Sequence, residues 1–383
     1  MSYDCIVLGA GLAGTSVAWH LSRCATDLRI LILERENAAG THASAQNAAM
    51  IRALVGEDEL VPFTTAGTRF WNQLPDELDW PGVFNRTGSL LLASEESTLE
   101  LLKRRVAEAV DHGLHAEIWS PQKCRTVFPA LAETPFLAAA YCADDGVGDP
   151  QALIDGFLAS ARQRGVEYRR KTEVHSLHCE NGRIAGVKLA SGETLRADRV
   201  VLAAGAWSPA LMQKAGVEGR GLQPHRRHLF VTGPAAQHVE GLRKQTPIVW
   251  HLDLQVYLRW ETGGLLFSAC DEDAYPACRP DVDPDIETFV EERVGKVFPF
   301  LLDLPLSNSW AGLRTFTPNH EFVLGAEADL PGLYYATGLG GHGVTCAAPA
   351  GGRVAQEILA DIQEKTPGSA EAPGCSCCDS TNV

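Results

Sequence analysis

Three glycines and one acid near the start of the chain have the types and spacing that dinucleotide binding requires. Gly9, Gly11 and Gly14 follow an apolar run at residues 3–8, and Glu34 lies twenty residues beyond the third glycine. The first glycine permits a tight turn, the second lets the backbone approach a pyrophosphate, and the third lets a helix pack against the strand. Glu34 can accept hydrogen bonds from a ribose diol and would repel a 2′-phosphate, which disfavours NADP. On this fingerprint alone, NAD and FAD are equally good candidates.

A run of small and polar residues at 40–50 follows this fingerprint. It is too polar, and too poor in large side chains, to form a core helix. Such a run lets a backbone lie against a flat ligand while Ser44, Gln46 and Asn47 offer hydrogen bonds. The alternative is a plain surface loop in which the serine caps a helix.

A second glycine-rich turn, Gly-Leu-Gly-Gly-His-Gly-Val-Thr, occupies residues 338–345. It follows an apolar strand predicted at residues 333–337 and precedes a helix predicted at 347–362. Another buried strand is predicted within residues 199–207, and it ends on small residues, as needed where a backbone passes close to a nucleotide. We therefore expect the two glycine-rich turns, one near each end of the chain, to frame the cofactor.

The elements that must position these residues are of the α/β type. A helix is predicted at residues 15–23, between strands at 3–8 and 28–33. The region from 223 to 306 is different, because it is richer in proline, aromatic residues and extended patterns. Its expected strands are 228–232, 255–260 and 264–268, and its expected helix is 283–298.

Two domains are expected from this division. The cofactor domain is predicted to be discontinuous, with residues 1–85, 146–222 and 308–365, and the substrate domain to comprise 86–145 and 223–307. Residues 366–383 are rich in Pro, Gly, Ser and Ala, which predicts a disordered tail. Cys375, Cys377 and Cys378 lie in this tail, and we favour a tail with no role in the reaction over soft-metal or redox chemistry.

Composition narrows the classes of function. The chain has 383 residues, 45% of them hydrophobic, which is ample for a buried core. A formal net charge of −15 argues against a nucleic-acid partner, because phosphate binding needs clustered cations. No run is long enough for a transmembrane segment, and the N-terminal run is typical of a buried strand instead of a signal peptide, so a cytoplasmic location is expected. The cysteines before the tail have no ligand-like spacing, and no metal site is expected.

With these motifs placed, residues 3–362 resemble the FAD-dependent D-amino-acid oxidase family, the group that includes glycine oxidase, sarcosine oxidase and D-amino-acid dehydrogenases. Four motifs carry the resemblance: the fingerprint through Arg35, residues 40–50, Ala-Ala-Gly-Ala-Trp at 203–207, and Trp-Ala-Gly-Leu-Arg at 310–314 together with the second glycine turn. The resemblance implies a Rossmann-like FAD-binding domain and a second, mostly antiparallel β domain for the substrate, as in glycine oxidase.

The resemblance also implies which residues contact FAD. The glycines of the fingerprint would hold the pyrophosphate, Glu34 the adenosine ribose, Arg35 the adenine side, and residues 340–345 the isoalloxazine. The full implied set is Gly9, Gly11, Leu12, Ala13, Gly14, Glu34, Arg35, Thr41, Ser44, Ala45, Gln46, Asn47, Val174, Ala204, Gly205, Trp207, Arg314, Gly338, Gly340, Gly341, His342, Gly343, Val344 and Thr345.

Four residues are implied at the reacting centre: Arg314, Tyr257, Met50 and His342. Arg314 matches the arginine that binds the substrate carboxylate, since a guanidinium fork binds a carboxylate bidentately. A structural salt bridge is its alternative role. Tyr257 matches a tyrosine that assists this arginine, with ordinary sheet packing as the alternative. His42 and Arg52 are further candidates for the substrate pocket.

Residues 221–227 and 310–315 look most like bacterial D-arginine-type dehydrogenases. Those enzymes carry a histidine at the position of Met50 and a glutamate near Gly88 and Ser89, and neither is present here. Arginine-like specificity is therefore not expected, and Met50 looks like the corresponding position of glycine oxidase. The cysteine that anchors flavin covalently in sarcosine oxidase would fall in residues 317–321, which contain none, so non-covalent FAD is expected.

The function implied is oxidation of the Cα–N bond of a small D-amino acid or glycine, by hydride transfer to flavin N5, to an imine that hydrolyses to a 2-oxo acid. Oxidation of a 2-hydroxy acid or an N-methyl amino acid on the same scaffold is one alternative. A flavin-binding subunit of a complex is another. The expected partners are a small carboxylate-bearing substrate and an electron acceptor, either oxygen or a quinone.

Overall fold

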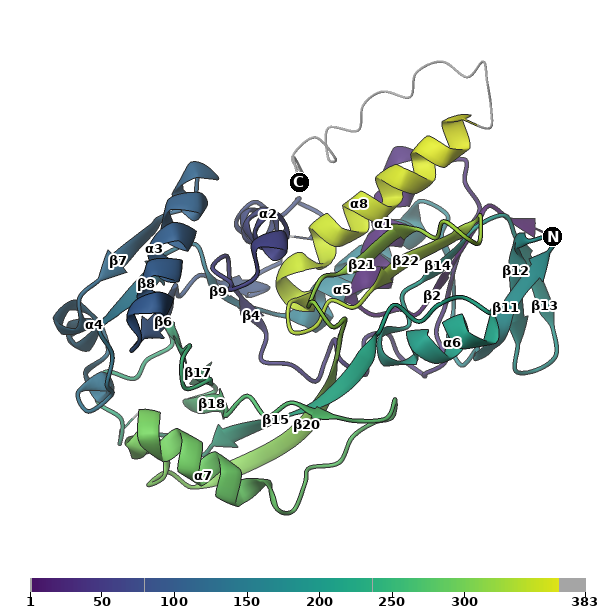
Figure 1. The fold of residues 1–383 in the computed structure, drawn as a ribbon. Helices are drawn as coiled ribbons and strands as arrows, with labels where there is room; N and C mark the ends of the chain where they lie inside the picture. Colours follow the sequence, from purple (N-terminus) through teal and green to yellow (C-terminus); the bar gives the residue numbers. More distant parts are fainter. Residues whose placement is uncertain (1, 79, 236, 365–383) are drawn as a thin grey trace.

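The computed structural model describes residues 2–78, 80–235 and 237–364, which form four β-sheets and the helices packed on them (Figure 1). One sheet has six strands, all parallel except the last. Its strands in spatial order are β10 (Glu167–Arg169), β3 (Ile30–Leu33), β2 (Cys5–Leu8), β14 (Val200–Leu202), β22 (Leu333–Thr337) and β21 (Val323–Ala326).

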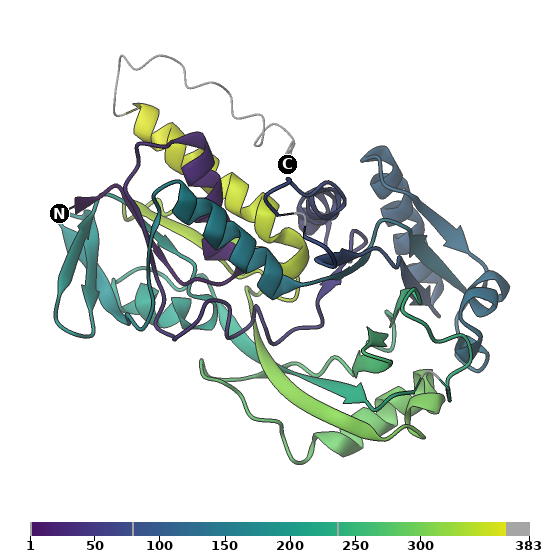
Figure 2. The same ribbon diagram turned by 180° about the vertical axis from the view of Figure 1, so that it is seen from behind.

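Both faces of the six-stranded sheet are covered, because its four inner strands β3, β2, β14 and β22 are buried at every position. In β2, for example, Cys5 and Val7 enter one core while Ile6 and Leu8 enter another. The first core lies under helices α1 (Leu12–Cys24), α5 (Pro150–Gln163) and α8 (Gly343–Glu364), which Figure 2 shows side by side. The second core lies under α6 (Ser208–Lys214) and a four-stranded sheet of β1 (Ser2–Tyr3), β13 (Thr194–Ala197), β12 (Arg183–Leu189) and β11 (Val174–Glu180).

The largest sheet forms the other lobe of the molecule (Figure 1). Its strands in order are β19 (Asp273–Ala274), β15 (Gln223–Thr232), β18 (Gly264–Ser268), β17 (Val256–Glu261), β16 (Ile248–His251), β6 (Ser89–Ala93), β8 (Ala138–Cys142) and β7 (Ala116–Trp119), and β20 (Leu306–Phe316) pairs with β15. Helices α4 (Pro121–Val127) and α7 (Ile286–Val297) share a core with one face. Helix α3 (Glu96–Asp111) packs on part of the opposite face, and the rest of that face points toward the first lobe.

A small three-stranded sheet lies between the two lobes. It contains β4 (Met50–Ile51), β9 (Gly146–Gly148) and β5 (Phe84–Asn85), and α2 (Val61–Asn72) packs beside it against α8. The contact between these two helices is close, because a Cβ on Gly67 would lie 2.1 Å from the carbonyl oxygen of Thr345. Within the described residues, no helix is long and apolar enough to span a bilayer.

The structure confirms the α/β class. Among its differences from the sequence-based elements, three concern β15, α8 and β20. Strand β15 begins at Gln223, not at 228, because its first residues pair with β20 and β19. Helix α8 begins at Gly343, so residues predicted as part of the glycine turn form its first turn. Strand β20 belongs to the largest sheet, so it crosses the predicted boundary at residue 308. The division into two domains stays a prediction, and the tail and its cysteines lie outside the described residues.

Candidate functional site

The carboxyl ends of β2 and β3 open into a cleft that the fingerprint residues line. Glu34 follows β3 and is largely buried, and its two carboxylate oxygens accept hydrogen bonds from the backbone N–H groups of Ala10 and Glu36, each at 2.9 Å. These bonds fix the carboxylate beside the glycine turn and leave a lone pair on each oxygen. Glu34 can therefore accept further hydrogen bonds from a ribose diol.

Trp207 forms one wall of this cleft. The Arg35 guanidinium lies 3.9 Å from the centre of the indole, and the His42 ring lies 4.5 Å from it. The Nε2 of His42 is 2.9 Å from Oε1 of Glu36. Of the candidates for the substrate pocket, His42 lines this cleft instead, as a loop histidine paired with Glu36, because the 40–50 run begins here and reaches the other pocket only at its end.

The glycines of the fingerprint have the close contacts that their spacing predicts. Gly9 has a φ of +103°, and a Cβ there would lie 2.5 Å from the carbonyl oxygen of Ala203. A Cβ on Gly14 would lie 2.0 Å from the oxygen of Gly9, so this glycine packs the helix on the strand turn and does not line the cleft. The N-terminus of α1 points its free N–H groups at the cleft, and that of Leu12 donates to the Ser44 hydroxyl at 3.1 Å.

The cleft continues toward the second glycine turn. Its lining there combines residues 11–13, residues 43, 44, 46 and 47, residues 313–315 of β20, and residues 336–341, 343 and 344. The 40–50 run is held on β20 by backbone contact, because a Cβ on Gly312 would lie 2.2 Å from the carbonyl oxygen of Gln46. Small residues on both sides thus leave a narrow, elongated space.

The shape and lining of this space fit FAD. Glu34 can accept hydrogen bonds from the ribose, and the N-terminus of α1 can donate hydrogen bonds to the pyrophosphate. The narrow space between two glycine-rich backbones has room for the flat isoalloxazine ring. Of the residues predicted to bind the cofactor, those that line the cleft are Gly9, Gly11, Leu12, Ala13, Glu34, Arg35, Thr41, Ser44, Gln46, Asn47, Val174, Ala204, Gly205, Trp207, Arg314, Gly338, Gly340, Gly341, Gly343 and Val344. Gly14 and Ala45 do not line it, and His342 and Thr345 line the neighbouring pocket.

A second cavity of about 450 Å³ lies beyond the second glycine turn, on the face of the large sheet opposite α7. It brings together all four residues predicted at the reacting centre: Met50, Tyr257, Arg314 and His342. Thr345 fixes the backbone of Met50 and Arg52 beside the pocket. Its hydroxyl accepts from the backbone N–H of Arg52 at 3.2 Å and donates to the Met50 carbonyl at 3.3 Å. Residues from four distant parts of the chain therefore share one pocket.

Three buried polar atoms of residues that line this pocket make no hydrogen bond within the described part of the chain. They are Nη1 of Arg314, the hydroxyl of Tyr257 and Nε1 of Trp250. Arg314 lines both the cofactor cleft and this pocket, and Gly341 lies against its side chain. Burial and the nearby Arg227 lower the pKa of Arg314, but a guanidinium stays charged at neutral pH. An uncompensated cation and a phenol of this kind are suited to bind an anionic ligand.

His342 is uncharged at physiological pH. Burial above all, together with the charges of Arg52, His320 and Arg314, lowers its pKa to about 3. A neutral imidazole so close to two guanidinium groups can accept or donate a hydrogen bond, but it does not repel a cationic or neutral amine.

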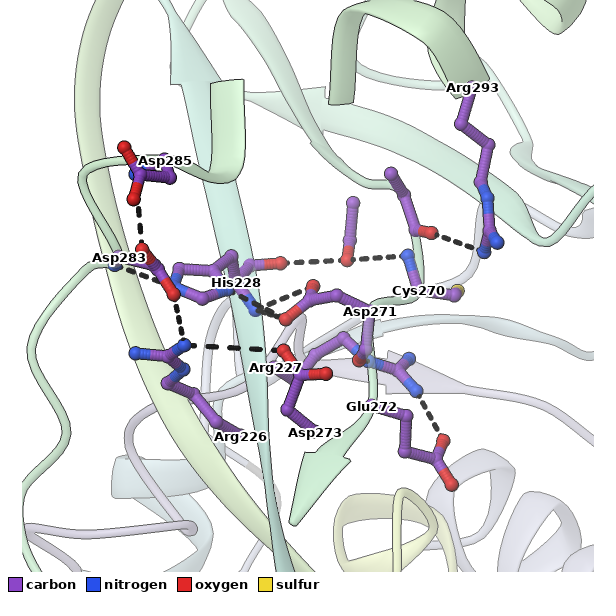
Figure 3. A network of polar contacts seen from close by, with 12 residues as sticks. Arg226, Arg227, His228, Cys270, Asp271, Glu272, Asp273, Asp283, Asp285 and Arg293 are labelled. Atoms are coloured by element: carbon purple, nitrogen blue, oxygen red, sulfur yellow. Dashed lines mark hydrogen bonds and ion pairs between the residues drawn. The ribbon is translucent and has the colours of Figure 1, made fainter. Parts of the chain in front are cut away.

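Arg227 is a pocket residue that the sequence motifs did not single out, and a network of polar contacts fixes it (Figure 3). Its Nε donates to the Asp271 carbonyl at 2.5 Å, and its Nη2 is 2.8 Å from Glu272. The Asp271 carboxylate lies 2.6 Å from Nδ1 of the buried His228, while Nε2 of His228 accepts from the backbone N–H of Asp283 at 2.9 Å. Because Nε2 accepts, Nδ1 carries the proton and donates to Asp271.

Trp250 is the other main pocket residue that sequence reasoning missed. Its ring lies 4.8 Å from that of Tyr257 and 4.0 Å from the Arg52 guanidinium. The sequence signal that could have found both residues is the alternation of side chains between the two faces of a strand. Arg227 shares the pocket-facing side of β15 with Leu229, and Trp250 pairs with Tyr257 across β16 and β17. Arg52, a predicted candidate, lies in the pocket beside them.

Known proteins resemble the chain over nearly its whole length. It is 25% identical over 366 residues to 4-methylaminobutanoate oxidase (formaldehyde-forming) of Paenarthrobacter nicotinovorans, covering 92% of this chain and 43% of that protein. It is 24% identical over 374 residues to the mitochondrial dimethylglycine dehydrogenase of Homo sapiens, covering 93% and 42%. The chain thus spans about two fifths of the length of these curated relatives.

Among solved structures, L-proline dehydrogenase from P. horikoshii superposes with a TM-score of 0.83 at 23% identity, covering 97% of this chain and 95% of that one. At that identity the likeness shows the fold alone. The family described as FAD dependent oxidoreductase (DAO) has a model that matches residues 4–357. Because this match includes both glycine turns, the cofactor cleft and the pocket with Arg314, the chain belongs to the FAD dependent oxidoreductase (DAO) family.

Proposed function

We propose that the protein oxidises the carbon–nitrogen bond of a small amino acid whose carboxylate binds Arg314. The observation that carries this proposal is the position of the unpartnered Arg314 guanidinium, which lines the cofactor cleft on one side and the substrate pocket on the other. A carboxylate on this group places its α-carbon at the boundary between the two spaces, where a substrate must meet the flavin ring.

FAD, when bound, supplies the two-electron acceptor of this reaction. The substrate loses its Cα hydrogen as a hydride and one N–H proton, which leaves a carbon–nitrogen double bond. Water then splits the imine into a 2-oxo acid and an amine. The chain's own residues bind and orient: Arg314 holds the carboxylate, Tyr257 donates a hydrogen bond to it, and neutral His342 leaves the amine without a competing charge. Because positioning does most of this work, no strong side-chain base is required.

The names of the relatives favour a second candidate, in which the nitrogen carries a methyl or other alkyl group. Both 4-methylaminobutanoate and dimethylglycine are carboxylates with an N-methylated amine. The same carboxylate anchor serves primary and N-alkylated amines, and in both candidates a carbon bonded to the nitrogen loses a hydride. Dimethylglycine has no N–H proton to lose, so it gives an iminium ion, which water cleaves to a carbonyl compound and a secondary amine.

Anaerobic mixing of the FAD-loaded protein with a panel of compounds tests the proposal. The panel contains D- and L-amino acids, glycine, sarcosine, dimethylglycine and 2-hydroxy acids. Bleaching of the flavin band by an amino acid supports the proposal, and a preference for sarcosine or dimethylglycine selects the second candidate. Bleaching by a 2-hydroxy acid alone contradicts it, and bleaching by no compound favours a flavin-binding subunit that serves a partner.

A further inference from the structure

The substrate pocket contains a second guanidinium without an acidic partner. Arg52 is 8% exposed, and its charged group lies over the ring of Trp250. Across the described residues, its side chain makes no hydrogen bond and no ion pair. A guanidinium stacked through its face keeps the N–H donors of its edge available for a ligand. Arg314, in the same pocket, has its own unpartnered nitrogen.

The acids near the pocket are engaged elsewhere. Glu272 pairs with Arg227 at 2.8 Å, and Asp253 accepts hydrogen bonds from Ser94 and Thr98. Glu57 lies 3.9 Å from Nδ1 of His320. None of the three forms an ion pair with Arg52 or Arg314.

Asp145 is the acid with the strongest influence on Arg52, but it does not neutralise that group by contact. It accepts from the Ser89 hydroxyl at 2.6 Å and from the Ala53 backbone N–H at 2.9 Å. Burial raises the pKa of Asp145 to about 6, so its negative charge is costly in this surrounding. Two cations therefore remain without contact partners inside one cavity, and buried charges in proteins are normally paired or ligand-bound.

We propose that the substrate is an amine with two carboxylates: one carboxylate binds Arg314 and the second binds Arg52. The shared chemistry is that of an amino dicarboxylate, with the second acid on the nitrogen substituent or on the side chain. His342 lines the same pocket as both guanidinium groups, and in this arrangement it would meet the amine as a neutral ring. This inference rests on the proposed function and names its substrate class.

The chemistry balances as for any amine in this site. In iminodiacetate, for example, one Cα loses a hydride to FAD and the nitrogen loses a proton. Water then cleaves the imine into glyoxylate and glycine. The second carboxylate takes no part in bond making, and its contribution is binding energy.

Matched pairs of substrates test the proposal in the FAD-loaded wild-type protein. Iminodiacetate is compared with sarcosine, and D- and L-aspartate with D- and L-alanine. We expect kcat/KM to be about 10- to 100-fold higher for the acid with two carboxylates, as a charge-assisted contact with a buried guanidinium implies. The pair with the larger ratio shows whether the second acid lies on the nitrogen or on the side chain. A preference for the monocarboxylate in every pair overturns the inference while leaving the proposed function intact.

The variant Arg52→Gln should remove the preference, because it should lower kcat/KM for the dicarboxylate at least tenfold more than for the matched monocarboxylate. If it lowers both members of a pair equally, Arg52 joins Arg314 on a single carboxylate and the inference fails. Arg52→Lys keeps the charge and should retain part of the preference, which separates loss of charge from loss of folding. Arg196→Gln, on an exposed strand of the four-stranded sheet, removes one positive charge away from the pocket and should change nothing.

A binding measurement decides the point without turnover. Diglycolate and methoxyacetate are the ether counterparts of iminodiacetate and sarcosine, and neither can form an imine. Titration against the flavin absorption band should give at least tenfold tighter binding of diglycolate, and Arg52→Gln should abolish the difference. Equal binding of diglycolate and methoxyacetate overturns the inference, whatever the amines do. The proposed function is tested separately, since it fails only if no amine bleaches the flavin.

Discussion

At the scale of single residues, Arg314 is the group on which substrate binding depends most directly under the proposed function. We expect Arg314→Ala to lower kcat/KM by on the order of 100-fold or more, because a bidentate, charge-assisted contact with the carboxylate is lost. Arg314→Lys should recover little, since an ammonium cannot reproduce the planar fork. Steady-state kinetics with the best substrate of the panel measures both, with Arg196→Ala as the control. Unchanged saturation in Arg314→Ala would contradict the carboxylate-binding role.

His342 allows a prediction about pH. Its pKa of about 3 means that the imidazole is neutral from about pH 4 upward. Its titration therefore causes no change in kcat/KM between pH 5 and 9. We expect kcat/KM to rise with pH as the substrate amine loses its proton, and the apparent pKa to follow the amine when substrates of different basicity are compared. His342→Gln should keep this limb. A limb near pH 6 to 7 that disappears in the variant would show that His342 titrates during turnover.

Single residues were predictable from the sequence where a motif fixes both type and place. Arg314, Tyr257, Met50 and His342 do lie in one pocket, although they come from four separate parts of the chain. Arg227 and Trp250 were missed because only the pairing of β15, β16 and β17 shows which alternate residues face the pocket. His42 was a candidate for the second pocket, but it lines the cofactor cleft, and only the fold shows which residues of the 40–50 run face which space.

At the scale of elements, the contact between β20 and the 40–50 run joins the two halves of the cofactor cleft. Gly312 has no room for a side chain, so Gly312→Ala must displace the backbone of Gln46. We expect apo-protein with this change to bind FAD about tenfold or more weakly and to lose about 1–3 kcal/mol in the free energy of unfolding. Titration of flavin fluorescence and denaturant unfolding measure these two effects.

Gly219→Ala is the matched control for that change. No atom lies within 4 Å of a Cβ built at Gly219, and its backbone is not in the left-handed region. If both alanine variants bind FAD equally well, the contact between β20 and residues 40–50 does not shape the cleft.

Elements were predictable where local pattern and burial agree. The β2–α1–β3 unit matches its expectation closely, because apolar runs, a glycine turn and an acid all favour the same structure. The start of α8 was predicted four residues late. A glycine at position 343 favours a turn in the sequence. In the fold, Trp71 Nε1 donates to the Val344 carbonyl and the Thr345 hydroxyl donates to the Met50 carbonyl. These tertiary contacts extend the helix to Gly343. The extent of β15 and β20 likewise depends on long-range pairing that no local pattern contains.

At the scale of the whole molecule, the cofactor cleft draws its lining from residues 8 to 344 and from both lobes. The sequence predicted this from two glycine turns near opposite ends of the chain, and their convergence follows from the central positions of β2, β14 and β22 in the six-stranded sheet. A ligand that contacts so many distant segments binds the folded chain and has no comparable site in the unfolded chain. FAD binding is therefore coupled to global unfolding.

This coupling gives the last prediction, which also tests whether the flavin is bound non-covalently. Acid precipitation should release all yellow colour into the supernatant, since residues 317–321 contain no cysteine to anchor it. The apo-protein obtained under milder conditions should regain stability on titration with FAD, by about 2.7 kcal/mol at a free concentration of 100 Kd, and its Tm should keep rising with the logarithm of that concentration. AMP, which reaches only the adenosine end of the cleft, should give a smaller rise. A pellet that stays yellow would contradict the non-covalent prediction, and a Tm independent of added FAD would show that the cleft does not couple the two lobes.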